Sequence, residues 1–302
     1  MSDPRAAAAT PPRRDPLAEL VHLPGVADAV TEARAAVDRL LGHRVLRRRS
    51  AEVTAESALR GARASAALEG AGIELERLRG QLLAGTAVTP GDRDARAGLV
   101  VQGAVRLHAD LGSVLASWRR SPRQAVARLH VLAAADLCSD PDTLGRPRMP
   151  TASYDDPLEL GAAADPVEVS ARLDGLVRLL LAPSAAPAIV VSAVVHAELL
   201  VLRPFGVADG LVARAAARLV LIDRGLDPKA VSAPEVGHLE VAAAGGGQDL
   251  HAAGVDYRSA ARGYIAGGPE GVARWLVHCA QAVSLGAREG VAVCEAIARQ
   301  AP

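Results

Sequence analysis

The segment "RPFGVADGLVAR" at positions 203–214 combines three charged side chains with a turn. It joins an apolar run that ends at Leu202 to a second apolar run that begins near Gly210. A helix that follows such a turn presents unpaired backbone N–H groups, which bind anions and above all phosphate. The guanidiniums of Arg203 and Arg214 suit phosphate because each can donate two parallel hydrogen bonds. The segment is a candidate anion site, with an ordinary helix–loop–helix corner as the alternative.

The same segment resembles the signature HPFxDGNGRxxR of the Fic (Fido) family, whose members typically transfer AMP from ATP to a protein hydroxyl. The register is kept over all twelve positions, and Pro204, Phe205, Gly210 and Arg214 are identical. The resemblance implies an all-α, Fic-like helical bundle, with ATP and Mg²⁺ as candidate cofactors. The residues expected to bind the anion or nucleotide are Arg203, Gly206, Asp209, Gly210 and Arg214.

Further stretches between about residue 50 and residue 290 extend the resemblance. "HAELLVLRPF" is similar to the family's H-x-x-F-x-x-I-H-P-F, which makes His196 the upstream histidine. "LGRPR" is similar to a flap with a Gly-x-x-Arg pattern, carried here by Gly145 and Arg148. "DYRSAARGYIAGGPEGVARWLVHCAQAV" is similar to the closing helices of the family. The ordered set of matches is more specific than any one of them.

The stretch "SAALEG" is similar to the S/T-x-x-x-E-G/N motif that keeps some Fic proteins inhibited, and it corresponds to Ser65, Glu69 and Gly70. In those proteins the motif glutamate pairs with the second arginine of the signature. The resemblance therefore implies an ion pair between Glu69 and Arg214. Ser65 lies one helical turn before Glu69 on the same face. The alternative is that Glu69 is a solvated helix residue and that an alanine-rich chain produces the match by chance.

The residues that carry the family's chemistry are replaced in this chain. The histidine that takes the proton from the attacking hydroxyl corresponds to Arg203, whose guanidinium stays protonated and offers no acceptor. The acidic metal ligand corresponds to Val207, the asparagine to Asp209 and the first arginine to Leu211. We therefore expect a Fic-family protein with a degenerate active site, which lacks AMP transfer and acts by binding or regulation.

The alternative function is a protein adenylyltransferase, or another nucleotidyl or phosphoryl transferase, that uses non-standard residues. Asp209 could hold a metal ion if the loop shifted by two residues. His196 lies two helical turns before Arg203 on the same face and could reach the pocket. The favoured readings are a His196 satisfied within the helical core and an Asp209 that serves as N-cap of a helix starting at Gly210. No residue is assigned a catalytic role, and no metal site is predicted.

Helical signals dominate the chain. Asp165–Pro166 and Ser121–Pro122 are typical helix starts, with capping-box spacing to the residues that follow. Gly225 is expected to end the helix that follows the turn in segment 203–214. The segment 141–154 has no helical period and predicts a flap, formed as a short hairpin or an irregular loop. The main helices are expected at 30–41, 51–68, from 166 to near 181, at 188–202, from about 210 to 224 and from about 269 to 299.

Three parts are expected along the 302 residues. Residues 1–15 read as a disordered tail, residues 16–90 as an N-terminal helical segment with the inhibitory motif, and residues 91–302 as the Fic-like core. Apolar residues make up half of the chain and aromatic residues only 2%, so the core must consist of closely packed alanine, leucine and valine.

The charge balance and the cysteines indicate which kinds of partner and which cell compartment to expect. Basic and acidic residues balance at 34 each, and the Arg-rich run at 43–49 lacks interleaved aromatics, so a nucleic acid is not an expected partner. The apolar run at 188–202 is too short to span a bilayer. Cys138, Cys279 and Cys294 have no metal-ligand spacing and predict reduced thiols in a cytoplasmic protein. A protein partner is expected, and a bound nucleotide and a homodimer remain open.

Overall fold

A computed structural model of the chain describes residues 15–90, 95–241 and 255–300. Every regular element within these ranges is a helix, and no strand occurs among them. The prediction of an all-α fold is therefore confirmed. The predicted tail lies outside the described residues except for Asp15, which is ordered. The Asp15 carboxylate accepts hydrogen bonds from the N–H groups of Leu17 and Ala185 and so begins the first helix.

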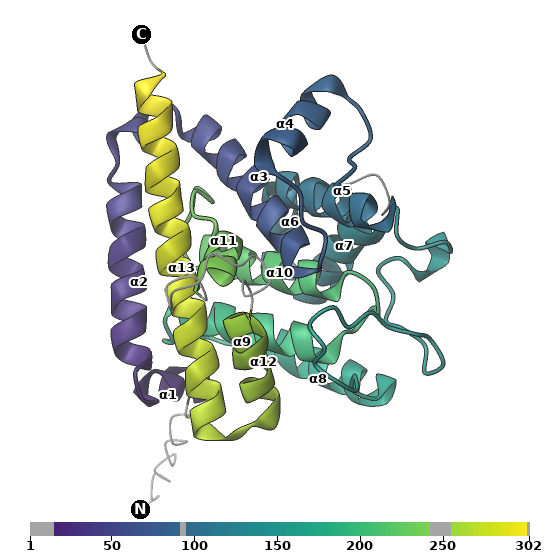
Figure 1. The fold of residues 1–302 in the computed structure, drawn as a ribbon. Helices are drawn as coiled ribbons and strands as arrows, with labels where there is room; N and C mark the ends of the chain where they lie inside the picture. Colours follow the sequence, from purple (N-terminus) through teal and green to yellow (C-terminus); the bar gives the residue numbers. More distant parts are fainter. Residues whose placement is uncertain (1–14, 91–94, 242–254, 301–302) are drawn as a thin grey trace, which may run out of the picture.

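Two consecutive helices, α9 (Ala188–Leu202) and α10 (Asp209–Asp223), lie at the centre of the molecule (Figure 1). Twelve of the 15 residues of α9 are buried, and in α10 only Asp223 is not. A helix that is apolar on every face can satisfy its side chains only inside a protein. The prediction that residues 188–202 form the central helix is confirmed, and the loop between α9 and α10 is held on both sides by buried helices.

The other helices surround this pair in two groups. On one side, α2 lies along the long α13, which also contacts α11 and α12; on the other side, α3, α5, α6 and α7 pack against one another and against α10 (Figure 1). Residues from both the 16–90 segment and the later chain share one hydrophobic core, so the division at residue 90 stays a prediction. The bounds of the remaining elements are α1 Pro16–Glu19, η1 Leu20–His22, α2 Val26–Leu41, η2 Arg44–Arg47, α3 Ser50–Leu68, α4 Leu75–Ala84, α5 Ala95–Ala109, α6 Leu111–Arg120, α7 Pro122–Ala134, η3 Pro141–Thr143, α8 Pro166–Leu181, α11 Pro234–Glu240, α12 Val255–Ala266 and α13 Gly268–Arg299.

The helix ends follow the capping residues with one exception. The Asp165 carboxylate accepts from the Val167 N–H at 2.8 Å, and α8 ends at Leu181 as expected. Gly225 adopts a left-handed φ of 74° directly after the C-cap of α10. Ser121 occupies the N-cap position of α7, but its side chain makes no capping hydrogen bond, so the capping box predicted there is wrong.

The flap segment 141–154 is an irregular loop that begins with the short helix η3, and the hairpin alternative is wrong. Pro147 and Pro150 lack the N–H groups that a hairpin ladder needs. The segment instead pairs with the loop after α9, because the Arg148 N–H donates to the Pro204 carbonyl at 2.8 Å. The flap therefore lies directly over the candidate site.

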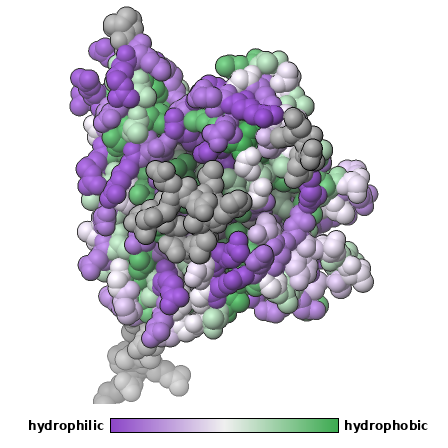
Figure 2. Space-filling model, in the orientation of Figure 1, coloured by the Kyte–Doolittle hydropathy of each residue, from purple (hydrophilic) through white to green (hydrophobic). Residues whose placement is uncertain are grey.

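Hydrophilic side chains dominate the visible outer edge formed by α2 and α13, with single apolar residues between them (Figure 2). Among the helices of the described ranges, none has both the length and the apolar character needed to cross a membrane.

Candidate functional site

The loop between α9 and α10 has an unusual backbone. Arg203, Gly206 and Ala208 adopt left-handed φ values of 43°, 84° and 57°. Only glycine reaches this region without steric cost, so Arg203 and Ala208 must be held there by the contacts around them. Such backbone strain concentrates at functional sites. The contacts that hold this loop are therefore the features that define the site.

The Asp209 side chain holds the loop from inside. Its carboxylate accepts hydrogen bonds from the N–H groups of Phe205, at 3.0 Å, and Gly206, at 2.7 Å. Ala208 is the N-cap residue of α10, so the prediction of an N-cap role for Asp209 is wrong. Burial raises the pKa of Asp209 to about 7, and the negative charge of nearby Glu69 contributes to this rise. The hydrogen bonds from the two N–H groups lower this pKa but do not offset burial. Two N–H groups of the loop, those of Phe205 and Gly206, are thus engaged by the chain itself.

Arg203 is turned into the protein and only 4% exposed. One Nη lies 3.2 Å from an Asp156 carboxylate oxygen, and the other donates to the Gly161 carbonyl at 2.7 Å. The guanidinium also lies over the Tyr154 ring, 4.8 Å from its centroid, in a cation–π contact. Each of these partners attracts a cation and together they hold Arg203 in place, although its Nε and Nη1 atoms make no hydrogen bond.

The two flap residues named from the sequence are both engaged. Arg148 donates from Nε to the Arg203 carbonyl at 3.0 Å, and its guanidinium also contacts the Ala164 carbonyl. The Gly145 N–H donates to His130 Nδ1 at 2.9 Å, and the His130 ring stacks on Phe205 of the loop with centroids 4.1 Å apart. His130 thus joins the flap to the loop.

The ion pair between Glu69 and Arg214, which the resemblance implies, is present. Glu69 Oε1 lies 2.6 Å from Arg214 Nη2, with the two side chains 8% and 1% exposed. Arg214 also donates to the Ser65 hydroxyl at 2.8 Å and to the Tyr257 hydroxyl at 3.3 Å. Burial opposes the charge of Arg214, but Glu69 more than offsets it, and the pKa of Arg214 lies above its usual value. An inhibitory role for the pair stays a prediction.

Gly210 leaves the space that the Glu69 carboxylate fills. A Cβ atom at position 210 would overlap Glu69 Oε1, whereas the conformation of Gly210 itself needs no left-handed φ. The first turn of α10 carries the positive end of the helix dipole, which favours a carboxylate there. Gly70 has a φ of 81° and ends the α3 segment directly after Glu69. Glu69 therefore occupies the place at the helix N-terminus where an external anion would bind.

The change Gly210→Ala is expected to lower the free energy of unfolding by about 1–3 kcal/mol, because the added methyl group must displace the Glu69 carboxylate. Gly80→Ala is the matched control, since Gly80 lies within α4 with no atom near its Cβ position. The control is expected to gain about 0.4–1 kcal/mol. Denaturant unfolding of both variants measures the difference, and equal stabilities would contradict the placement of Glu69.

His196 lies in the core and not at the loop. Its Nε2 is 2.8 Å from the Tyr257 hydroxyl, and burial lowers its pKa well below the usual value. This is the core histidine that the sequence favoured over a catalytic one. Asp156, Tyr154, His130 and Tyr257 carry much of the site and were not predicted. No local pattern marks them, because each meets its partner only through the tertiary fold.

The free space between the loop, the flap and Glu69 is about 20 Å³. That volume holds about one water molecule, whereas pockets for small molecules measure roughly 300–1,000 Å³. The carboxylates of Glu69, Asp155, Asp156 and Asp209 line this space and would repel phosphates, and Val207 of the loop supplies no metal ligand. The residues present therefore do not fit the phosphates of a nucleotide with their Mg²⁺ ion.

No protein-family model matches the sequence, and no curated protein matches it. Several solved structures are similar to this chain, and they include proteins from three organisms. A Fic family protein from Desulfovibrio desulfuricans G20 has a TM-score of 0.67 and 18% identity over 89% of this chain and 75% of that one. Fic-1 (residues 134–508) from C. elegans has a TM-score of 0.61 and 17% identity over 90% and 73%. A Fic domain containing signaling protein from Bacteroides thetaiotaomicron VPI-5482 has a TM-score of 0.57 and 14% identity over 89% and 98%.

These likenesses cover almost all of the described chain and agree with the resemblance seen in its loop. Identities of 14–18% support the fold and leave the chemistry to the residues of the site. The helical bundle of this chain has the Fic fold.

Proposed function

We propose that this chain is a Fic-fold protein with a degenerate active site, which does not transfer AMP and acts by binding or regulating another protein. The observation that carries the proposal is the state of Arg203. It takes the place of the family's histidine in the resemblance, and its buried guanidinium is committed to Asp156 and Gly161. A general base must accept a proton, and a guanidinium cannot do so near neutral pH.

The surroundings of the loop support the same proposal. Asp209 takes the N–H groups of Phe205 and Gly206, and Glu69 lies against Gly210. A phosphate would have to displace both carboxylates and be held mainly by Arg214. The site is therefore better suited to a closed conformation than to nucleotide turnover.

Incubation of the unchanged protein with ATP labelled at its α-phosphate, Mg²⁺ and a cell lysate is expected to label no protein above background. Arg203→His is expected to restore little activity, because Val207 and Leu211 still leave the phosphates unsupported. Glu69→Gly opens the space beside Gly210 and so tests whether the chain is an active transferase whose site is only blocked by Glu69. Robust labelling by the unchanged chain or by Glu69→Gly would support the alternative of a transferase with non-standard residues.

The partner and location form part of the proposal. A cytoplasmic protein partner fits a regulatory role, and self-association into a homodimer is one form of it. Light scattering coupled to gel filtration separates these forms by measuring the mass of the isolated chain.

A further inference from the structure

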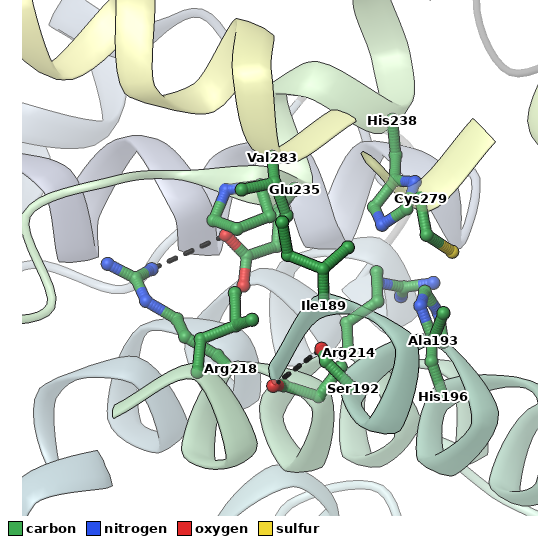
Figure 3. Close-up of a pocket in the computed structure, with 13 residues that line it drawn as sticks. Ile189, Ser192, Ala193, His196, Arg214, Arg218, Glu235, His238, Cys279 and Val283 are labelled. Carbon is green, nitrogen blue, oxygen red and sulfur yellow. Dashed lines mark hydrogen bonds and ion pairs between the residues drawn. The ribbon is translucent and has the colours of Figure 1, made fainter. Parts of the chain in front are cut away.

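A second cluster of chemically active side chains lies inside the molecule, away from the loop. His196 of α9, His238 of α11 and Cys279 of α13 are all buried, and one ligand atom of each lies within 4.8 Å of those of the other two. Figure 3 shows the three side chains gathered on one side of an internal pocket, with Arg218 and Glu235 on the other side. The proposed function uses none of the three.

Close packing of the helices brings these residues together. Gly237, directly before His238, lies so near α13 that a Cβ atom there would overlap the Ala282 carbonyl. This contact between the backbones of α11 and α13 places His238 beside Cys279. The ring of His196 meets that of His238 edge to face, with centroids 5.0 Å apart. The arrangement is fixed by three helices and does not depend on a mobile loop.

Each of the two imidazoles contacts a polar neighbour that fixes its orientation. His238 Nδ1 lies 3.0 Å from His278 Nε2, and His196 Nε2 lies 2.8 Å from the Tyr257 hydroxyl. Each ring therefore has one nitrogen held by a neighbour, which leaves its second nitrogen as a candidate ligand. Burial lowers the pKa of both histidines well below the usual value, so both rings are neutral at pH 7. The neutral imidazole is the form that binds a metal ion.

The space beside the cluster has room for one small ligand. The pocket that the three residues line has a free volume of about 20 Å³, enough for one water molecule. In a tetrahedral zinc site with nitrogen and sulfur ligands, neighbouring ligand atoms lie about 3.3–3.6 Å apart. The three side chains would each need to move by less than about 1 Å to reach this spacing.

Charge does not exclude a cation here. Arg214 lines the same pocket, but Glu69 pairs with it at 2.6 Å. Binding of a metal ion releases the thiol proton of Cys279 to solvent and leaves a thiolate that offsets part of the ion's charge. Hard ions such as Mg²⁺ and Ca²⁺ prefer oxygen ligands, whereas zinc prefers imidazole and thiolate.

We propose that His196, His238 and Cys279 bind one zinc ion, with a water molecule as the fourth ligand. The ion joins α9, α11 and α13 and so stabilises the core. His278 and Tyr257 position the two histidine ligands. None of its ligands lies in the loop or the flap, although the Tyr257 hydroxyl contacts both the ligand His196 and Arg214 of the candidate site.

Zinc analysis of the tag-free protein after incubation with a zinc salt and gel filtration tests the site. We expect about one zinc ion per chain and a raised melting temperature that a chelator reverses. Cys279→Ser and His238→Gln are expected to weaken zinc binding at least tenfold. The matched control is Cys294→Ser, a buried cysteine of the same helix outside the cluster, which should keep the ion.

If Cys279→Ser does not fold, the absorption spectrum of a Co²⁺ complex tests whether Cys279 is a metal ligand. The double variant Cys138→Ser/Cys294→Ser retains Cys279 as its single cysteine. Its Co²⁺ complex should show the thiolate-to-metal charge-transfer band of a cysteine ligand. The proposal is overturned if the unchanged chain and the double variant bind no zinc and show no such band, or if Cys279→Ser and His238→Gln bind zinc as tightly as the unchanged chain.

Discussion

Acidification from pH 7 to pH 5 is expected to lower the free energy of unfolding by roughly 7 kcal/mol. Among the residues that the structure describes, five histidines are buried, and burial lowers the pKa of each one in the folded chain, to about 4 for two of them. The unfolded chain takes up these protons near pH 6.5, while the folded chain stays neutral. Stability is therefore full above pH 6.5 and is lost as the pH falls below it. The five residues are His108, His130, His196, His238 and His278.

The size of the effect follows from the number of protons. Each buried histidine costs about 2 kcal/mol between pH 7 and pH 5. Asp209 acts in the opposite direction, because its pKa of about 7 keeps it protonated in the folded chain while the unfolded carboxyl is ionised. Asp209 therefore raises the free energy of unfolding by about 2 kcal/mol between pH 7 and pH 5. Since domains are stable by about 5–15 kcal/mol, the chain is expected to unfold near pH 5.

Denaturant titrations at pH 7, 6 and 5, with a chelator present, measure this loss. His130→Gln is expected to reduce the uptake of protons on unfolding at pH 5 by about one, because His130 no longer titrates. Asp209→Asn removes the opposing contribution and should make the loss on acidification steeper. A free energy of unfolding that stays constant from pH 7 to pH 5 would contradict the neutral burial of these histidines.

The change Glu69→Ala is expected to lower the free energy of unfolding by about 3–5 kcal/mol, because it leaves the Arg214 guanidinium charged and buried without its partner. For a chain of this length the melting temperature should fall by roughly 5–10 °C. Glu32→Ala is the matched control, since the Glu32–Arg288 pair is exposed on both sides and is expected to contribute about 0–1 kcal/mol.

An activity measurement distinguishes an inhibitory role of the Glu69–Arg214 pair from a purely stabilising one. In a Fic protein that is merely inhibited, loss of the motif glutamate releases AMP transfer. Here Glu69→Ala is expected to destabilise the chain and to release no transfer, because Arg203 still replaces the general base. The Glu69→Gln protein should be less stable than the unchanged chain and more stable than Glu69→Ala, since glutamine keeps a hydrogen-bond acceptor for Arg214 and loses the charge. A Glu69→Ala protein as stable as the unchanged chain would show that Arg214 does not depend on this carboxylate.

Sequence patterns identified several of the helices, including the two that flank the loop. Local periodicity is set by which side chains face the core, so the apolar run at 188–202 identified α9 with its bounds, and Asp165 and Gly225 marked two helix ends. The register of the loop also identified Glu69 and Arg214 as partners, 145 residues apart, through a resemblance and not through local physics.

Only the tertiary structure decided what the charged side chains do. Asp209 was expected to cap α10 and instead binds two N–H groups of the loop, because the left-handed backbone turns them toward its carboxylate. Arg203 found Asp156, 47 positions earlier, only after the flap folded over the loop.

The His196, His238 and Cys279 cluster shows the same limit most clearly. Its members lie 42 and 41 positions apart along the chain and share no motif. The period of each helix determines which side chains point inward, but not which inward side chains from different helices meet. That choice depends on the depth at which α9, α11 and α13 cross, which the contact of Gly237 with α13 fixes in the folded chain.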